Sequence, residues 1–401
     1  MDLSFTAEER AFRDEMRTFF RHEIPAEIRA RAGKGEHVSK QDLVTTQQAM
    51  NKAGIAVPHW PVAWGGKDWT SVQSYIWLDE MQLAGVPAPL AFNTSMVGPV
   101  IAQFGSAAQK QRFLPATANL DIWWCQGFSE PGAGSDLASL RTTARREGDE
   151  WVINGQKTWT TLAQHADWIF LLCRTSTAAK KQEGISFLVV DMKAPGITVR
   201  PIQTIDGGYE VNEVWFDEVR TPAGNLVGEE NRGWDYAKFL LGNERTGIAR
   251  IGVSKARLLR LRELAKLERT GDRPMIEDRR FREKLTAVEI ELKALEMTQL
   301  RVVASERTRE RGKPNPASSI LKLKGSEIQQ ATTELLMEVV GPYALPYKAD
   351  VEAEGDNDPM SIGPDYAAEA APTYFNWRKV SIYGGSNEIQ RNIVAKAILG
   401  F

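Results

Sequence analysis

The residues that decide the fold of this chain read Cys125-Gln-Gly-Phe-Ser-Glu-Pro-Gly-Ala-Gly-Ser-Asp136 and Asn154-Gly-Gln-Lys-Thr-Trp-Thr-Thr161. The first segment predicts a turn that presents polar groups. Pro131 restricts its own φ angle, and Gly132 and Gly134 permit backbone conformations and close approach that a side chain would obstruct. Ser129, Ser135 and backbone N–H groups are then available to a ligand.

The second segment has the pattern of a strand that turns. Trp151 and Ile153 alternate with polar residues, Asn154-Gly155 is a favoured hairpin turn, and Trp159 follows among β-favouring threonines. We expect a loop and a hairpin that together cup a flat polar ligand. The same residues also fit a surface turn followed by an ordinary hairpin.

Composition narrows the function. Lys and Arg number 50 against 52 Asp and Glu in 401 residues, which argues against a nucleic-acid partner. The four histidines are scattered without metal-ligand spacing, so no metal site is expected, and neither a G-x-G-x-x-G nor a P-loop motif occurs. Cys125 and Cys173 lie in apolar surroundings and predict buried thiols. With no signal peptide and no apolar run of about 20 residues, we expect a soluble cytoplasmic protein without membrane contact.

The pattern of apolar, β-branched and turn-forming residues along the chain predicts three regions. Residues 1–120 are expected to be helical, beginning after Thr6-Ala-Glu-Glu, which is typical of a capped helix start. Residues 121–230 contain short β-branched and aromatic runs that predict an antiparallel sheet domain. Residues 231–401 are helical again. There the apolar seam of one long helix is formed by Phe281, Leu285, Val288, Leu292, Leu295 and Val302, with one polar step at Gln299.

The segment from Leu345 to Ala371 interrupts this helical pattern. It carries acidic residues, prolines and glycines without periodicity, and so predicts a loop. We expect either an acidic solvated loop or one that covers a substrate entrance or contacts a partner subunit.

A second motif, Ile382-Tyr-Gly-Gly-Ser-Asn-Glu-Ile-Gln-Arg391, stands near the C-terminus. Together with the Cys125–Thr161 segment, in this order and over essentially the whole chain, it resembles the signatures of the acyl-CoA dehydrogenases. The resemblance implies an α+β multidomain fold with an N-terminal α-helical domain (1–120), a middle β-sheet domain (121–230) and a C-terminal four-helix bundle (231–401). It also implies FAD as the cofactor and a dimer or tetramer.

The chemistry of that family requires a base for the Cα proton and an acceptor for the Cβ hydride. No side chain accepts hydride, so the implied acceptor is N5 of the flavin. Glu244 suits the base, because a carboxylate in an apolar site has a raised pKa. It lies in an apolar stripe at helical spacing formed by Ala237, Leu241, Ile248 and Ile251. From the residues alone, a structural ion pair and a catalytic role both remain open for Glu244.

One position departs from the most common family pattern. Many members carry the catalytic glutamate directly after the tyrosine of the C-terminal motif, where this chain has Gly384. Isovaleryl- and long-chain-type members instead place it on an earlier helix before an arginine, and Glu244-Arg245 matches that position. The Gly384 N–H would still polarise the thioester carbonyl. Arg245 would contact polar parts of the substrate or support Glu244.

The resemblance assigns the remaining contacts residue by residue. Flavin contacts are implied for Gln126, Phe128, Ser129, Trp159 and Thr161. Ser135 would meet both the cofactor and the pantetheine chain of the substrate. Positions that reach the ADP half of the flavin, often from a neighbouring subunit, are matched by Gly341, Ser386 and Glu388. Arg269 is a candidate for the flavin pyrophosphate, although Thr-Gly-Asp follows it where the family has Phe-Gly.

The predicted function is therefore the oxidation of an acyl-CoA to the trans-2-enoyl-CoA, as in fatty acid β-oxidation, with an electron-transferring flavoprotein as acceptor. The chain also resembles the large subunits of pimeloyl-CoA dehydrogenases, which implies a dicarboxylyl substrate and a second, smaller subunit. Two alternatives are a flavin monooxygenase on the same fold, which would not need Glu244, and a non-catalytic subunit of a heteromeric acyl-CoA dehydrogenase.

Overall fold

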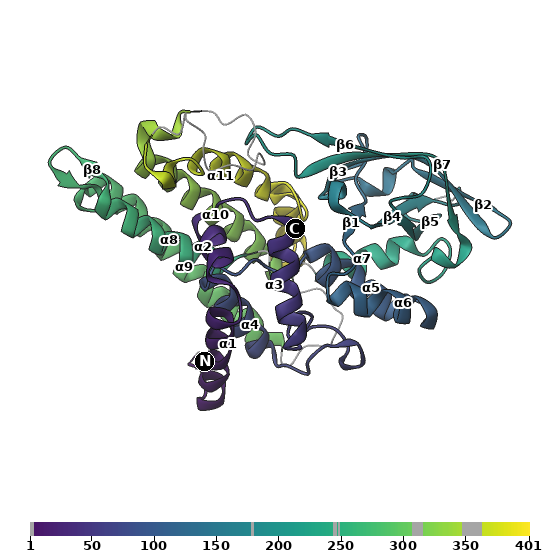
Figure 1. Ribbon diagram of the computed structural model, residues 1–401, viewed down its shortest axis with the longest axis horizontal. Coiled ribbons are helices and arrows are strands. Elements are labelled where there is room, and N and C mark those ends of the chain that lie inside the picture. Colours follow the sequence, from purple (N-terminus) through teal and green to yellow (C-terminus); the bar gives the residue numbers. More distant parts are fainter. Residues whose placement is uncertain (1–3, 178–179, 244–246, 248, 307–315, 347–362) are drawn as a thin grey trace.

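A computed structural model describes residues 4–177, 180–243, 247, 249–306, 316–346 and 363–401 (Figure 1). Two predictions of the sequence fall outside these ranges. One is the expected base Glu244 with its neighbour Arg245. The other is the acidic part of the segment after Leu345, from Asp350 to Asp358.

The first region is helical, as predicted. Its helices are α1 (Ala7–His22), α2 (Ala26–Lys34), α3 (Lys40–Lys52), α4 (Ser71–Leu83), the π-helix η2 (Phe92–Val97), α5 (Gly98–Phe104) and α6 (Ala107–Ala118). The Thr6 side chain accepts from the Glu9 N–H at 3.1 Å and the Glu9 carboxylate accepts from the Thr6 N–H at 2.9 Å, which completes the expected capping box. Met16 and Phe20 are buried on the inner face of α1.

The middle region is a seven-stranded sheet. Its strands are β1 (Trp124–Gly127), β2 (Thr143–Glu147), β3 (Glu150–Thr161), β4 (Trp168–Arg174), β5 (Ile185–Asp191), β6 (Ile197–Ile202) and β7 (Val211–Pro222). The order is β1-β4-β2-β3-β7-β6, with β5 on β4. Most pairs are antiparallel, as predicted, but β1 runs parallel to β4 and β2 meets β4 in parallel at Thr143 and Arg174. The sheet is therefore mixed.

The hairpin predicted at Asn154-Gly155 is wrong. Strand β3 continues through both residues, and the turn lies at Gly148, between β2 and β3, where φ is +58°. Gly155 serves a bulge instead: the pairing with β7 shifts register between Ile153 and Gly155, and its φ is +148°. A Cβ there would lie 2.5 Å from Thr142 Oγ1, so this position requires glycine for close approach.

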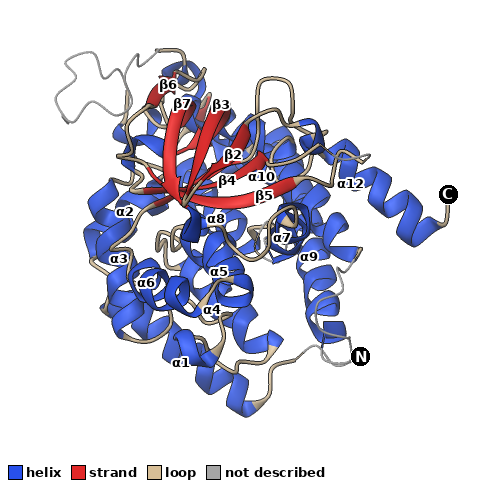
Figure 2. Ribbon diagram, turned by 90° about the vertical axis from the view of Figure 1, so that its right-hand side faces the viewer, coloured by secondary structure: helices blue, strands red, loops and turns tan. Residues whose placement is uncertain are grey.

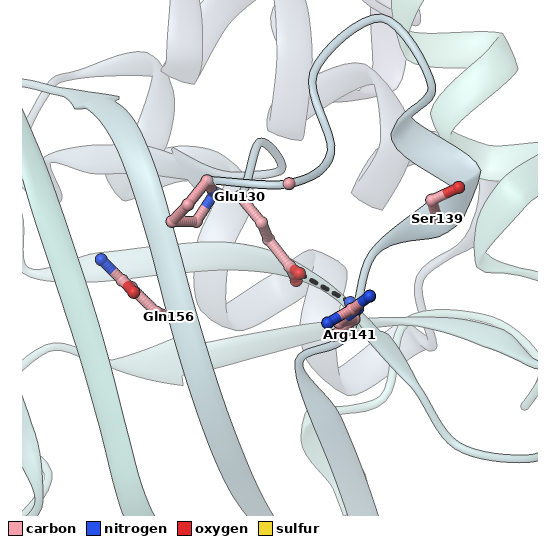
Figure 3. Close-up of a pocket in the computed structure, with 6 residues that line it drawn as sticks. Glu130, Ser139, Arg141 and Gln156 are labelled. Atoms are coloured by element: carbon pink, nitrogen blue, oxygen red, sulfur yellow. Dashed lines mark hydrogen bonds between the residues drawn. The ribbon is translucent and has the colours of Figure 1, made fainter.

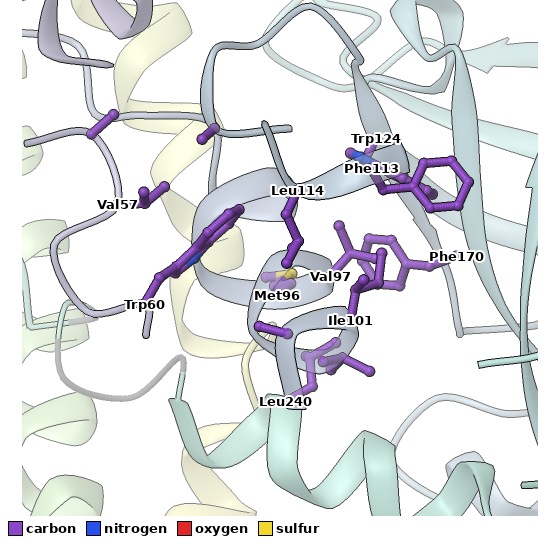
Figure 4. Close-up of a cluster of buried hydrophobic side chains, with 14 of the residues drawn as sticks. Val57, Trp60, Met96, Val97, Ile101, Phe113, Leu114, Trp124, Phe170 and Leu240 are labelled. Atoms are coloured by element: carbon purple, nitrogen blue, oxygen red, sulfur yellow. The ribbon is translucent and has the colours of Figure 1, made fainter. Parts of the chain in front are cut away.

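Helices and sheet share one core. Buried side chains of η2, α5 and α6 meet those of β1, β4 and the C-terminal region's first helix, α7 (Gly233–Asn243), as Figure 4 shows for Val97, Ile101, Phe113, Phe170 and Leu240. The Phe113 ring meets the Trp124 ring edge-on, with centroids 5.3 Å apart. This core fixes the sheet, which lies at one end of the molecule, relative to α5, α6 and α7 (Figure 1 and Figure 2).

The last region is also helical. It continues with α8 (Ile251–Leu267), the small hairpin β8 (Arg269–Thr270) and β9 (Arg273–Pro274), α9 (Arg279–Glu306), α10 (Ala317–Val340), α11 (Ala370–Asn376) and α12 (Asn387–Val394). The predicted seam of α9 is confirmed, because Phe281, Leu285, Leu292 and Leu295 are buried. Gln299, the polar step, is buried as well.

The apolar stripe around Glu244 is divided between two helices. Helix α7 is described over Gly233–Asn243, and α8 begins at Ile251. Arg250, the residue before α8, has left-handed backbone angles (φ 46°, ψ 46°), which a continuing right-handed helix excludes. Ala237 and Ile251 are nevertheless buried, as the stripe predicts.

Both cysteines are buried and free, as predicted. No helix in the described ranges is both long and apolar enough to cross a membrane. Within the same ranges, His, Cys, Asp and Glu side chains form no group of three or more that could hold a metal ion.

Candidate functional site

The loop after β1 lies against the second half of β3. The Thr158 N–H donates to the Ser129 carbonyl at 2.9 Å, and the Lys157 ammonium donates to the Phe128 carbonyl at 3.1 Å. These bonds bring residues 126–129 together with residues 157–161. We call this pair of segments the platform.

Trp159 is the most unusual residue of the platform. It lies inside a strand, yet its φ is +58° and 60% of its surface is exposed. The register between β3 and β7 shifts around it, between Lys157 and Thr160. A left-handed backbone at a bulky residue costs about 1–3 kcal/mol, and it persists where the surroundings impose it, often at ligand sites. The exposed indole is therefore a surface that a ligand could contact and is not part of the core.

The side chains of the β1 loop point to different environments. Phe128 is buried and packs edge-on against Phe170 and Phe187, so only its backbone can reach a ligand. Gln126 and Ser129 are half-buried, as is Thr161 on β3. These three keep polar groups at the platform surface.

The glycine-rich turn is open. The Glu130 and Ala133 backbones exchange two hydrogen bonds of 3.0 Å, and Ser135 lies exposed beyond them. A Cβ at Gly132 or Gly134 would meet nothing within 4 Å, and neither residue has a positive φ. The expected special backbone conformation is therefore wrong for both glycines, whereas the close approach of another group stays a prediction. What they leave is empty room above the turn.

A hollow of about 300 Å³ borders this turn (Figure 3). It is lined by Glu130, Pro131, Gly132, Ser139, Arg141 and Gln156. The Glu130 carboxylate lies at its base and accepts from the Arg141 N–H at 2.6 Å and the Thr142 N–H at 2.9 Å. Burial raises the pKa of Glu130, but the Lys157 charge and these hydrogen bonds bring it below its ordinary value. Glu130 is therefore ionised at neutral pH.

The C-terminal motif forms a turn with two left-handed glycines, Gly384 (φ +64°) and Gly385 (φ +79°). The buried Gln390 side chain donates its amide to both glycine carbonyls, at 3.3 and 3.2 Å. Because peptide groups are trans, the N–H groups of Gly385 and Ser386 point away from Gln390. Gln390 thus holds the turn around Gly384, a role that the sequence did not reveal.

Polar contacts join this motif to the platform. Lys379, five residues before Gly384, forms an ion pair with Glu210 in the loop before β7, and Asn376 donates to Asp206 at 2.7 Å. The Glu210 carbonyl accepts from the N–H of Leu162, which directly follows Thr161, at 2.7 Å. Burial lowers the pKa of Lys379 to about 8, and Asp206 opposes that shift. The predicted contacts of the middle and C-terminal regions are linked by these few groups.

The other predicted contacts lie at the end of α10, at the start of α12 and in the β8–β9 hairpin. Gly341 ends α10 with φ +58° and is half-buried, and Ser386 caps α12 by accepting from the Ile389 N–H at 3.4 Å. Glu388 is exposed, and its own backbone N–H and the Ser386 hydroxyl lower its pKa. Arg269 lies in the β8–β9 hairpin, at the opposite end of the molecule from the sheet (Figure 1). One copy of the chain does not bring Arg269 to the platform.

The comparisons with known proteins agree with this architecture. Three family models match: the acyl-CoA dehydrogenase N-terminal domain over residues 6–121, the middle domain over 125–219 and the C-terminal domain over 231–399. The acyl-CoA dehydrogenase IpdE1 of Mycobacterium tuberculosis is 35% identical over 397 residues, 97% of each chain.

Solved structures agree as well. The ChsE4-ChsE5 complex of M. tuberculosis superposes with a TM-score of 0.82 at 30% identity, covering 100% of this chain and 99% of the other. The structure "Tcur3481-Tcur3483 steroid ACAD" gives the same TM-score, identity and coverage of both chains. With all three domains matched in order and relatives similar over nearly their full length, the chain is an oxidoreductase of the acyl-CoA dehydrogenase family.

Proposed function

We propose that the protein is an FAD-dependent enzyme that converts an acyl-CoA to the trans-2-enoyl-CoA. The platform is the observation that supports this most directly. An exposed indole in a strained backbone, half-buried polar side chains beside it and empty room above Gly132 and Gly134 fit a broad, flat, polar group. Gln126, Ser129, Trp159 and Thr161, with the Phe128 backbone, would hold the flavin. When bound, it supplies the hydride acceptor that no side chain provides.

The residues of the chain would divide the remaining chemistry. Glu244 is the proposed base for the Cα proton, with Arg245 beside it for polar parts of the substrate. Gly384 would donate its N–H to the thioester carbonyl, and the Gln390 clamp keeps the adjoining turn rigid. Ser135, exposed beside the open turn, would contact both cofactor and pantetheine.

Assembly and substrate are part of the proposal. Gly341, Ser386, Glu388 and Arg269 would contact the flavin of a second chain, either another copy or a second acyl-CoA dehydrogenase subunit. The similar ChsE4-ChsE5 and Tcur3481-Tcur3483 structures each name two components, which favours the second case. A steroid-derived acyl-CoA is the first substrate class to test, and dicarboxylyl-CoAs are the next. The proposed electron acceptor is an electron-transferring flavoprotein.

The variant Glu244→Gln tests the assignment of the base. The amide cannot accept the Cα proton, so we expect bound flavin in normal amount and turnover reduced about 10²–10⁴-fold. Glu230→Gln is the control: its carboxylate is exposed and none of the proposed cofactor or substrate contacts involves it, so turnover is expected to stay within a factor of about 3. Near wild-type turnover in Glu244→Gln would contradict the assignment.

A further inference from the structure

A buried ion pair lies on the inner side of the platform, and Lys157 of the platform is one of its members. The Lys157 ammonium is 2.8 Å from Glu130 Oε1, and the two side chains are 0% and 7% exposed. Lys157 belongs to β3, whereas Glu130 begins the glycine-rich turn. The pair therefore joins the two halves of the platform from the protein side.

A gain in stability is a weak explanation for this pair. Removing two charges from water costs several kcal/mol each, and well-packed apolar residues at such positions are often as stable or more so. Burial lowers the pKa of Lys157, and the Glu130 charge counteracts that shift. A charged pair kept at this cost suggests a role in geometry or electrostatics.

The geometry shows which groups the pair fixes. The Lys157 ammonium holds the Phe128 carbonyl, so the Ser129 N–H of the same trans peptide points away from Lys157. The next carbonyl, that of Ser129, is held by the Thr158 N–H. Glu130 is itself fixed by three donors: Lys157 and the N–H groups of Arg141 and Thr142. The Lys157 ammonium and the Thr158 N–H thus orient two successive peptide groups of the loop.

We infer that Lys157 and Glu130 are positioning residues, which orient the Phe128–Ser129 peptides toward the cofactor and balance the charge beneath it. The inference rests on the proposed function, because it takes the flavin as the group held by the platform. Its two parts, the orientation of the peptides and the balance of charge, can be tested separately. Loss of the hydrogen bonds misorients the loop, whereas loss of only one partner leaves an uncompensated charge next to the site.

The test compares three variants: Lys157→Met, Glu130→Gln and the double variant. Each loses a charge-assisted hydrogen bond to the loop, and we expect flavin affinity to fall about 10- to 100-fold in all three. The flavin reduction potential separates the charge effect. Glu130→Gln leaves a cation and is expected to raise the potential, Lys157→Met leaves an anion and is expected to lower it, and the double variant is expected to return toward wild type.

Lys193→Met is the control, because Lys193 is an exposed lysine of the same domain. It is expected to leave both affinity and potential unchanged. The double variant carries no unpaired buried charge, so it keeps the test valid where a single variant fails to fold. Single variants that shift the potential in the same direction, or a double variant that binds flavin as tightly as wild type, would overturn the inference.

Hydrogen–deuterium exchange of the flavin-free protein provides an independent readout. Lys157→Met is expected to lose protection in residues 126–131 and 157–161, with the rest of the sheet unchanged. Unchanged protection there would overturn the positioning role. A wild-type protein that binds no flavin would refute the proposed function, while this exchange measurement would still decide whether Lys157 holds the loop.

Discussion

At the scale of one residue, Trp159 is both strained and exposed, which the proposed flavin site would explain. Its indole is 60% exposed and its φ is +58°, so neither burial nor backbone preference favours tryptophan at this position. We expect Trp159→Gly to leave the free energy of unfolding of the flavin-free protein unchanged or up to about 1 kcal/mol higher, since glycine relieves the strain but loses more chain entropy on folding. Flavin affinity is expected to fall. Urea unfolding and flavin titration measure both, and a loss of more than about 1 kcal/mol would show that the indole is structural.

Replacing either of two glycines in the same region by alanine is expected to have opposite effects: one should change ligand binding and the other should change stability. Gly134→Ala places its Cβ in open space, so the unfolding free energy is expected to change by less than about 0.5 kcal/mol, while affinity for flavin or acyl-CoA falls if a ligand occupies that room. Gly127→Ala is the control. Its Cβ would lie 2.7 Å from Leu171 Cδ1, and overpacking there is expected to cost about 1–3 kcal/mol. Unchanged binding by folded Gly134→Ala would show that no ligand approaches this turn.

The sequence predicted some features of single residues and not others. The capping box at Thr6, the buried cysteines and the seam of α9 follow from local patterns, and the structure confirms them. Lys157 and Gln390 were not recognised, because a lysine in a strand and a glutamine in a helix are ordinary residues until their partners are known. Glu130 lies 27 positions before Lys157, and the two glycine carbonyls that Gln390 binds lie 6 and 5 positions before it.

At the scale of elements, the sequence predicted the apolar strands of the sheet but not its polar strand. Strands β3 to β7 contain the expected β-branched runs. Strand β2 does not: of Thr143–Glu147 only Ala144 is buried, so no alternation marks it. The misplaced hairpin has a similar cause, because Asn-Gly favours a turn locally, whereas pairing with β7 keeps β3 extended through a bulge.

The packing of α1 on α4 makes a prediction about pH. Buried Glu80 on α4 accepts from Arg13 at 2.5 Å and from Arg17 at 3.0 Å. Burial raises the pKa of Glu80, but the bonds to Arg17 and Arg13 bring it below its ordinary value of 4.5. A lowered pKa in the folded state stabilises the fold above pH 4.5, and this contribution is lost as the pH falls through the folded-state pKa.

The variant Glu80→Gln therefore loses stability at neutral pH, by about 1–3 kcal/mol after allowance for the partly exposed arginines. Its unfolding free energy is expected to decline less steeply than that of wild type below pH 4.5. Glu147→Gln, in an exposed network with Arg145 and Arg220, is the comparison, with a much smaller loss expected at pH 7. Parallel pH profiles for wild type and Glu80→Gln would contradict this account.

At the scale of the whole molecule, the predicted site draws on regions far apart in sequence. The platform belongs to the sheet and Gly384 to the last turn before α12, and the Lys379–Glu210 ion pair and the Asn376–Asp206 hydrogen bond link the two. The order of helical, sheet and helical regions could be predicted from the residue pattern along the chain. The family could be predicted from two motifs. The acyl group could not, because chain length and polarity depend on the shape of a cavity that residues distant in sequence form together.

An anaerobic titration of the purified protein with a panel of acyl-CoAs tests the central claim most directly. The panel contains straight-chain, branched, dicarboxylyl and steroid-derived thioesters, with the flavin absorbance followed at each addition. The account predicts that one class bleaches the flavin and yields the 2-enoyl-CoA in stoichiometric amount. A protein that binds flavin, alone or with a co-purifying second subunit, and is reduced by no member of the panel would contradict it.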